Sequence, residues 1–340
     1  MLCWWYNGSA YYRKGWLLIM EPLFLKSYFQ AKIWGGRKLE TEFGYELPAG
    51  KIGECWAISA HPHGPSTVLN GPLAGLNLAE AYTQHPEYFG NPKSKVFPLL
   101  TKILDAEASL SVQVHPDNDY AEAHEHELGK TECWYIIKAD PDSYLIYGHH
   151  AKSRAELADW INQGQWEKLL RKVPVKTGDF VYVPSGTIHA LNKGILALET
   201  QQSSDTTYRL YDYDRVDQAT GQKRSLHLQQ SIDVTTVPFK QPRLNIQKKQ
   251  LGASEITSYV QPPLSPFFSV WQWDIHGEVI GQHEQGAYTL ASVISGNGSI
   301  KVDQQVFPLQ KGQHFILPAQ ISQWTLDGNM QIIASESTEN

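Results

Sequence analysis

Two stretches of the chain share one pattern and decide the fold: KTGDFVYVPSGTIHAL (176–191) and QKGQHFILPAQISQWTL (310–326). Both place a glycine and a proline at the same spacing, which in the first copy are Gly178 and Pro184. His189 closes the first copy, and a glutamine stands at the matching position of the second. A strand-forming unit that recurs in one chain predicts a duplicated β-barrel.

The repeat extends upstream and loses its polar residues in the second copy. TECWYII (131–137) corresponds to TLASVIS (289–295), so Leu290 stands where the first copy has Glu132. Gln323 likewise replaces the histidine of the first copy. We therefore expect chemistry in the first barrel only.

The rest of the chain is rich in short strand-like runs. Gly and Pro punctuate them, which is typical of a jelly roll rather than of a parallel sheet. The clearest runs are ECWAISA (54–60), SLSVQVH (109–115), CWYIIKA (133–139), SYLIYG (143–148), DFVYVP (179–184) and ILALETQ (195–201). Asn77 with Glu80, and Ser153 with Glu156, have the spacing of helix N-terminal caps. The predicted fold is mainly β, with two jelly-roll β-barrels and helical insertions in the first.

Three segments are expected along the chain. Residues 1–19, MLCWWYNGSAYYRKGWLLI, differ in character from the remainder of the chain and predict an upstream extension, with the natural start at Met20. An additional N-terminal strand is the alternative. Residues 20–250 form the predicted catalytic domain, and residues 251–340 form a degenerate second barrel without metal ligands.

Composition narrows the classes of function. The 340 residues include 29 Lys plus Arg and 35 Asp plus Glu, a formal charge of −6, so a nucleic-acid partner is not expected. No apolar run approaches the roughly 20 residues that cross a bilayer, so no membrane partner is expected either. Cys3, Cys55 and Cys133 are too scattered for a disulfide framework, which predicts a reducing cytoplasm. Any metal must be held by His, carboxylate or amide groups.

Four side chains on strand-like runs form a candidate metal site. Gln113 and His115 alternate with Val114, so both point to the same face of their strand. Glu132 begins the next run and His189 ends a later one. A barrel that brings these strands together would converge one amide oxygen, two imidazoles and one carboxylate, a set that suits a borderline divalent ion such as Zn²⁺. Cys133 faces the other side of its strand, which argues against a catalytic thiol.

Further polar residues surround this set. Lys130 and Ser111 each lie two residues before a candidate ligand and could reach the same cavity. Arg209 and Arg215 follow the His189 strand and could bind phosphate oxygens in a bidentate manner. In the alternative interpretation these arginines only form surface ion pairs with neighbouring aspartates. Those aspartates are Asp205, Asp212 and Asp214.

Several long motifs together resemble one family. They are EPLFLKSYFQAKIWGGRKL (21–39), GECWAISAHPHGPSTV (53–68), LSVQVHPDNDYA (110–121), ELGKTECWYII (127–137), VPSGTIHAL (183–191) and SDTTYRLYDYDR (204–215). In this order they resemble the type I mannose-6-phosphate isomerases in their short bacterial form, a zinc-dependent family of the cupin superfamily. The resemblance runs from Met20 to the C-terminus and implies two cupin-type barrels.

The resemblance also implies roles for individual residues. Gln113, His115, Glu132 and His189 match the ligands of one zinc ion per chain. Arg209 matches the catalytic arginine of the family, and Lys130 and Ser111 match residues of the sugar-phosphate pocket. Glu199 falls where a glutamate is a candidate for proton transfer, and Arg215 lies at a basic position that could assist the phosphate.

The expected activity interconverts mannose 6-phosphate and fructose 6-phosphate through a cis-enediol. Such an isomerase needs an acid–base group and stabilisation of the developing oxygen charge. Glu199, Lys130 and a zinc-bound water are alternative bases, of which an ammonium is the least favourable because it must first lose a proton. The only expected partner is a small sugar phosphate, and the chain is expected to be a monomer or weak homodimer.

Two other functions compete with the isomerase. Two His and one carboxylate in a β-barrel also describe a non-haem iron oxygenase, although Gln113 as a further ligand would occupy a position that oxygen needs. A catalytically silent barrel that senses phosphosugars is the second rival. The first barrel has a complete set of polar candidate site residues, which argues against a protein without catalytic activity.

Overall fold

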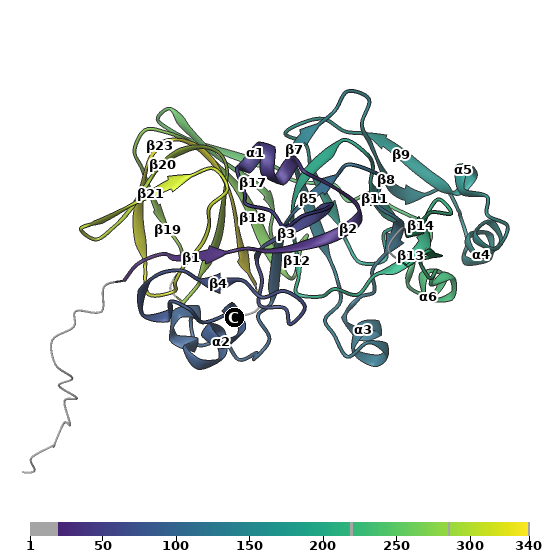
Figure 1. Ribbon diagram of the computed structural model, residues 1–340, viewed down its shortest axis with the longest axis horizontal. Helices are drawn as coiled ribbons and strands as arrows, with labels where there is room; N and C mark the ends of the chain where they lie inside the picture. The colour runs from purple at the N-terminus through teal and green to yellow at the C-terminus, as the bar shows by residue number, and fades with distance from the viewer. Residues whose placement is uncertain (1–19, 218–219, 285, 339–340) are drawn as a thin grey trace, which may run out of the picture.

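The computed structural model describes residues 20–217, 220–284 and 286–338. The chain is mainly β, as predicted, and its strands form three large antiparallel sheets and one two-stranded ribbon. Figure 1 shows the strands of the first barrel on the right and those of the C-terminal barrel, in green and yellow, on the left. The expected upstream extension, residues 1–19, lies outside the described residues.

Two facing sheets build the first barrel. The six-stranded sheet has the order β10-β7-β12-β5-β3-β2, and the five-stranded sheet has the order β13-β6-β11-β8-β9. The strands of the first are Phe180–Val183 (β10), Glu132–Ala139 (β7), Ile195–Gln202 (β12), Leu99–Ala106 (β5), Ile52–Ile58 (β3) and Tyr28–Gly36 (β2). Those of the second are Tyr208–Tyr211 (β13), Val112–Val114 (β6), His189–Leu191 (β11), Tyr144–His149 (β8) and Leu170–Pro174 (β9). Val216–Asp217 (β14) and Gln222–Lys223 (β15) form the ribbon.

The ten-stranded sheet builds the C-terminal barrel and recruits two strands from the start of the chain. Its members are Leu23–Lys26 (β1), Thr67–Val68 (β4), Gln247–Leu251 (β16), Ser254–Val260 (β17), Phe268–His276 (β18), Val279–Gln282 (β19), Thr289–Val302 (β20), Gln305–Gln310 (β21), His314–Leu317 (β22) and Gln323–Ser337 (β23). β1 pairs with β22, so the chain first contributes an edge to the second barrel and then enters the first. The expected division at residue 250 stays a prediction.

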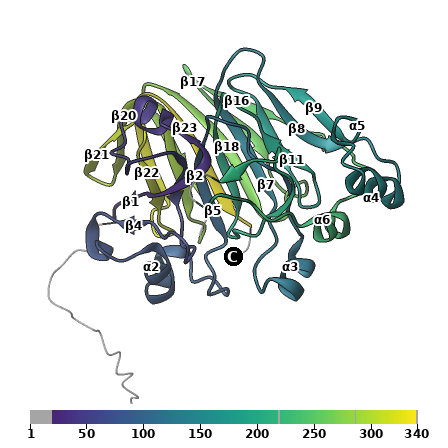
Figure 2. The same cartoon turned by 45° about the vertical axis from the view of Figure 1, so that its right-hand side comes forward.

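Short helices decorate the barrels. They are Lys38–Phe43 (α1), Leu78–Gln84 (α2), Asn118–His124 (α3), Arg154–Asn162 (α4), Trp166–Leu169 (α5) and Leu228–Val234 (α6), with the 3-10 helices Gly71–Leu73 (η1) and Pro86–Phe89 (η2). Both predicted caps are confirmed, because Asn77 and Glu80 form a reciprocal capping box and the Ser153 hydroxyl accepts from the Glu156 amide. Figures 1 and 2 show α4, α5 and α6 grouped at the end of the molecule remote from the C-terminal barrel. No helix of the described residues has the length and apolar character of a membrane span.

The six-stranded sheet is buried on both faces, and successive side chains of β7 pack alternately into the two cores on either side of it. Trp134 and Ile136 point into the first barrel, where they pack with residues of the five-stranded sheet. Cys133 and Tyr135 point the other way, into a core shared with the C-terminal barrel. Because adjacent residues of a strand face opposite sides, Glu132 must share the interior face with Trp134.

The pairing of β1 with the second barrel should contribute measurably to stability. Leu23 has no exposed surface and belongs to the core shared by the two barrels. Leu23→Ala should lower the free energy of unfolding by about 2–5 kcal/mol, because it removes buried methyl groups and leaves a cavity. Urea denaturation of the full chain measures this loss. The matched variant Leu69→Ala, at a 56% exposed position, should change little, and equal losses in both variants would contradict the assignment.

Candidate metal centre

One row of paired residues crosses the five-stranded sheet and carries three of the predicted side chains. On β6, Gln113 is the register partner of His189 on β11 and of Arg209 on β13. Directly paired residues of neighbouring strands present their side chains on the same face. The pairing therefore places an amide, an imidazole and a guanidinium side by side, although they are far apart in sequence.

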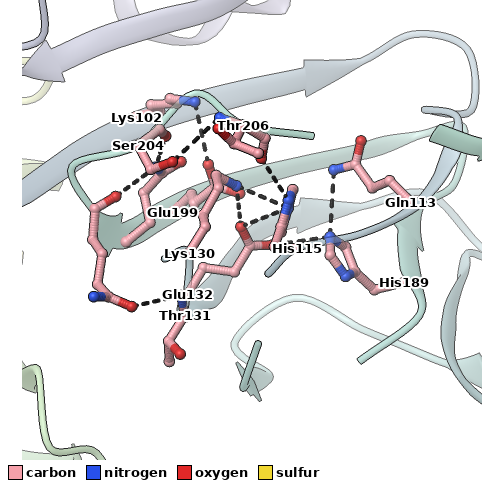
Figure 3. A network of polar contacts seen from close by, with 12 residues as sticks. Lys102, Gln113, His115, Lys130, Thr131, Glu132, His189, Glu199, Ser204 and Thr206 are labelled. Atoms are coloured by element: carbon pink, nitrogen blue, oxygen red, sulfur yellow. Dashed lines mark hydrogen bonds and ion pairs between the residues drawn. The ribbon is translucent and has the colours of Figure 1, made fainter. Parts of the chain in front are cut away.

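Glu132 approaches this row from the facing sheet. Its carboxylate lies 3.2 Å from His189 Nε2 and 3.4 Å from His115 Nε2, and none of the three side chains is more than 1% exposed. His115 follows β6 directly, and Pro116 comes next. Figure 3 shows the two imidazoles, the carboxylate and the Gln113 amide converging inside the barrel. One ligand atom from each of His115, Glu132 and His189 lies within 4.8 Å of the others.

Backbone carbonyls orient both imidazoles. His115 Nδ1 lies 2.9 Å from the Thr206 carbonyl, and His189 Nδ1 lies 2.8 Å from the Thr187 carbonyl. A carbonyl only accepts, so each Nδ1 carries the proton and each Nε2 presents a lone pair to the centre. Burial, followed by the charge of Lys130, lowers the pKa of His115 to about 3, and burial also lowers the pKa of His189. Both rings are therefore neutral.

The donor set fits a cation. Two imidazole lone pairs face a buried carboxylate whose Oε1 has no hydrogen-bond donor among the described residues. A buried acceptor that lacks a donor costs free energy, and a divalent ion would satisfy all three groups at once. Fixing the tautomer of each imidazole through a backbone carbonyl is also the usual support of a metal-ligating histidine.

Gln113 can complete the set through its amide oxygen. Its Nε2 lies 3.3 Å from His189 Nε2. The nitrogen and oxygen of a side-chain amide exchange places by a rotation of the last torsion, so the oxygen can occupy this position. Such a rotation would add a fourth ligand to His115, Glu132 and His189.

Lys130 meets the same donors. Its ammonium donates to Glu132 Oε2 and lies 3.0 Å from His115 Nε2. Although burial acts to raise it, the charge of Lys130 holds the pKa of Glu132 well below its ordinary value. A metal ion and this ammonium would therefore share the negative charge of one carboxylate.

A second row of residues crosses the interior face of the six-stranded sheet; the sequence pointed to Glu199 in this row but not to its partner Lys102. Trp134, Glu199, Lys102 and Trp56 are register partners across β7, β12, β5 and β3. Lys102 Nζ lies 3.7 Å from Glu199 and 3.9 Å from Glu54, and all three side chains are buried. The indole of Trp134 donates to Glu199 at 2.8 Å and packs edge-on against His189. A lysine within an apolar strand run, LLTKILDA (99–106), was the available signal.

The two carboxylates that share Lys102, Glu199 and Glu54, have pKa values shifted in opposite directions. Burial and the nearby charge of Glu132 raise the pKa of Glu199. Burial also acts to raise the pKa of Glu54, but Lys102 and Lys32 outweigh it and the pKa is lowered. Glu199 is thus the buried carboxylate of this network that more readily accepts a proton.

The structure separates the two predicted arginines. Arg209 is half-buried beside Gln113, donates to the Ser225 carbonyl at 3.0 Å, and has a buried Nε without a partner among the described residues. Arg215 instead pairs with Asp212 at 2.5 Å; this is one of the aspartates named in the alternative interpretation, but it is buried, so the ion pair does not lie at the surface. Arg224, which the sequence analysis did not single out, also pairs with Asp212 at 2.6 Å.

The remaining predicted residue, Ser111, is buried directly before β6, two residues from Gln113. Together the fold and the donor set define a jelly-roll barrel with a candidate metal centre between its two sheets. Residues 23–160 match the family model "Phosphomannose isomerase type I, catalytic domain", and residues 255–337 match "Mannose-6-phosphate isomerase, cupin domain".

Relatives match over nearly the whole chain. The mannose-6-phosphate isomerase of Streptococcus mutans is 56% identical over 319 residues, which cover 94% of this chain and 99% of the relative. Mannose-6-phosphate isomerase ManA of Bacillus subtilis is 48% identical over 316 residues, or 93% and 98% of the two chains. This chain belongs to the type I mannose-6-phosphate isomerase family, which confirms the resemblance found in the sequence.

Solved structures agree with this assignment. The crystal structure of the mannose 6-phosphate isomerase from Bacillus subtilis superposes with a TM-score of 0.88 at 48% identity, covering 92% of this chain and 99% of that one. A putative mannosephosphate isomerase from Archaeoglobus fulgidus shares the fold, with a TM-score of 0.73 at 19% identity over 93% and 98% of the two chains.

The buried network predicts a pH-dependent stability defect. Lys102→Met should lower the free energy of unfolding at pH 7 by about 3–5 kcal/mol, because it leaves Glu54 and Glu199 buried without their shared ammonium. Burial would then raise the pKa of Glu199 further above its unfolded value, whereas Glu54 keeps its ion pair with Lys32. Stability in the variant should therefore fall as pH rises through the unfolded pKa, so the defect is smaller near pH 5.

Urea denaturation at both pH values checks this prediction. Lys138→Met is the matched control, since Lys138 is exposed and pairs with Glu42 at the surface, and it should change little. A defect in Lys102→Met that is the same at both pH values would contradict the account.

Proposed function

We propose that this chain is a zinc-dependent isomerase that interconverts mannose 6-phosphate and fructose 6-phosphate through a cis-enediol. The observation that carries the proposal is the convergence of His115, Glu132 and His189 on one buried point, with the Gln113 amide beside them. The relatives named as mannose-6-phosphate isomerases support the substrate, because they match over more than nine-tenths of the chain.

Zinc is the proposed ion, one per chain. Gln113, His115, Glu132 and His189 would hold it, since a set of two imidazoles, a carboxylate and an amide oxygen suits a borderline divalent cation. When bound, zinc would act as a Lewis acid toward the substrate oxygens on which negative charge develops. The carbonyls of Thr206 and Thr187 keep the two imidazoles aimed at this point.

Arg209 binds negative charge next to the ligand row. Its position opposite Gln113 places a permanent cation beside the proposed zinc site, and its unpartnered Nε is available to an anionic oxygen. Arg209 would thus neutralise the substrate phosphate or the developing enediolate. Arg215, engaged with Asp212, would assist by adding positive charge near the phosphate.

Glu199 is the proposed proton-transfer group. It shares the interior face with Glu132, and its raised pKa suits a carboxylate that takes a proton from one carbon and returns it to the next. Lys102 and the Trp134 indole hold the carboxylate in place. Lys130 would contribute by orienting Glu132 and substrate oxygens rather than as the base, because its ammonium is committed to Glu132. Ser111 would line the sugar-phosphate pocket.

The competing functions receive less support. Membership in an isomerase family favours isomerisation over oxygen chemistry and over silent sensing. The only partner proposed is the sugar phosphate. A cytoplasmic location and a monomeric or weakly dimeric state stay predictions.

Metal removal should abolish the activity. The purified full chain should carry one zinc per chain by elemental analysis, lose isomerase activity on chelation, and regain it when zinc is restored. Glu132→Gln should weaken zinc binding by more than the roughly 10–100-fold typical of a residue that only supports a ligand. The control His85→Gln, at an exposed histidine, should bind zinc normally. Full activity of the chelated protein would refute the proposed site.

Two variants separate charge binding from proton transfer. Arg209→Ala should lower kcat/KM about 100-fold or more, and Glu199→Gln should lower kcat about 100- to 10,000-fold with a smaller change in KM. Both should keep their zinc, because neither residue belongs to the proposed ligand set. A coupled assay and elemental analysis measure these effects, with Lys223→Ala as a nearby surface control. Undiminished turnover in Glu199→Gln would show that Glu199 is not the base and that another group transfers the proton.

A further inference from the structure

The C-terminal barrel contains a cavity of about 820 Å³. Its described lining residues come from β16, β17, β18, β19 and β23, from the residues that follow β17 and from the loop around His283, and none of them belongs to the two sheets of the first barrel. The volume lies within the range of roughly 300–1,000 Å³ that is common for small-molecule sites. Because its described lining residues all lie outside the first barrel, the cavity is separate from the proposed zinc site.

Tryptophans form one wall of this cavity. Trp271 and Trp273 alternate along β18, so both face the same side, and each keeps part of its surface exposed. Trp324, at the start of β23, is only 3% exposed, and its ring centre lies 6.0 Å from that of Trp273 at an interplanar angle of 32°. These indoles offer broad apolar faces to a ligand.

Three hydrogen-bonded polar side chains, Glu336, Thr289 and His283, lie beside the tryptophans. Glu336 is the register partner of Ser269, so it shares a face with Trp271. The Thr289 hydroxyl donates to Glu336 Oε1 at 2.5 Å, and His283 Nδ1 lies 3.1 Å from the same hydroxyl. Burial raises the pKa of Glu336 and lowers that of His283, so the imidazole is neutral. Glu336 keeps further acceptor capacity, because this hydroxyl satisfies only part of it.

The indole N–H of Trp324 has no acceptor among the described residues. Gly281 is its register partner, and a Cβ at Gly281 would lie 2.3 Å from this nitrogen, so only glycine leaves room for the ring. A buried donor without an acceptor is costly unless a ligand or water supplies one. This nitrogen is fully buried against Gly281, so the polar partner that the cavity offers next to its flat apolar surfaces is the Glu336 carboxylate.

This combination selects one ligand chemistry. An anion is disfavoured because Glu284 and Glu336 line the cavity, and Lys249 is the one cationic side chain among the described residues of its lining. A wholly apolar ligand would leave the remaining acceptor capacity of Glu336 without a donor. A cation is the main competitor, because it could lie over the face of one indole near Glu284 and Glu336, and the test below therefore includes a cationic probe. A neutral sugar ring has both an apolar C–H face and hydroxyls that donate and accept.

We propose that the C-terminal barrel holds a second carbohydrate site, which binds a neutral pyranose on Trp271 and Trp273 with Glu336 accepting from its hydroxyls. The site lacks the arginines and the donor set of the first barrel, so it binds sugar without isomerising it. It does not depend on the activity proposed for the first barrel.

Binding of methyl α-D-mannopyranoside to the full chain tests the proposal. This probe carries no phosphate and has a blocked anomeric carbon, so an isomerase cannot convert it. Saturation-transfer NMR should show saturable binding with a Kd of about 1–10 mM. Trp273→Leu and Glu336→Gln should each weaken binding at least about 10-fold. The matched control Trp160→Leu, on α4 of the first barrel, should leave Kd unchanged.

Arg209→Ala locates the bound sugar. Retention of binding in Arg209→Ala, with loss in Glu336→Gln, supports the second site, and Glu336→Gln decides the matter even where Trp273→Leu fails to fold. No saturable binding of the glycoside would overturn the proposal. So would loss of binding in Arg209→Ala with retention in Glu336→Gln, or saturable binding of tetramethylammonium or inorganic phosphate in place of the glycoside.

Discussion

A carboxylate without exposed surface, Glu132, governs the arrangement of the first barrel. Moving one charge out of water costs several kcal/mol, and only a matching positive charge with good geometry offsets it. Around Glu132 the structure places the Lys130 ammonium and two imidazole lone pairs. Lone pairs alone repel a carboxylate, so the pair of histidines makes chemical sense as a cation site rather than as a structural cluster.

This arrangement depends on the exact register of the strands in both sheets. Arg209, Gln113 and His189 form one row in the five-stranded sheet, while Glu199 and Lys102 belong to a row in the facing sheet. A slip of one residue in any of these strands would turn its side chains to the opposite face. The β7 strand illustrates the cost, because Cys133 and Tyr135 pack in the core shared with the C-terminal barrel. The alternation of side chains along β7 therefore determines both the packing between the barrels and the position of Glu132 inside the first barrel.

Local patterns allowed much of this to be predicted, and long-range pairing explains the rest. Alternation, caps and the repeat predicted the β class and both helix starts, since these depend on neighbouring residues. Lys102 escaped notice because its role requires two carboxylates from strands far away in sequence. The pairing of β1 with β22 is likewise invisible locally. For Arg215, a nearby aspartate was a sufficient signal of its ion pair, whereas nothing local distinguished Arg209.

The two barrels show how one fold can diverge in chemistry. The expected match of Leu290 with Glu132 is wrong by one residue: Thr289 pairs with Leu317 as Glu132 pairs with Val183, and Leu290 faces the core shared by the barrels, as Cys133 does. With Thr289 in place of Glu132 and Gln323 in place of His189, the second barrel has no carboxylate–imidazole pair at these positions to hold an ion. Its polar groups stand elsewhere, at Glu336 and in the loop before β20, and tryptophans occupy the adjacent wall. Without a buried carboxylate at the position of Glu132, the second barrel has no charge there to balance, which permits a cavity with larger apolar surfaces. On the two proposals made above, recognition of a neutral ring would belong to the second barrel and isomerisation to the first.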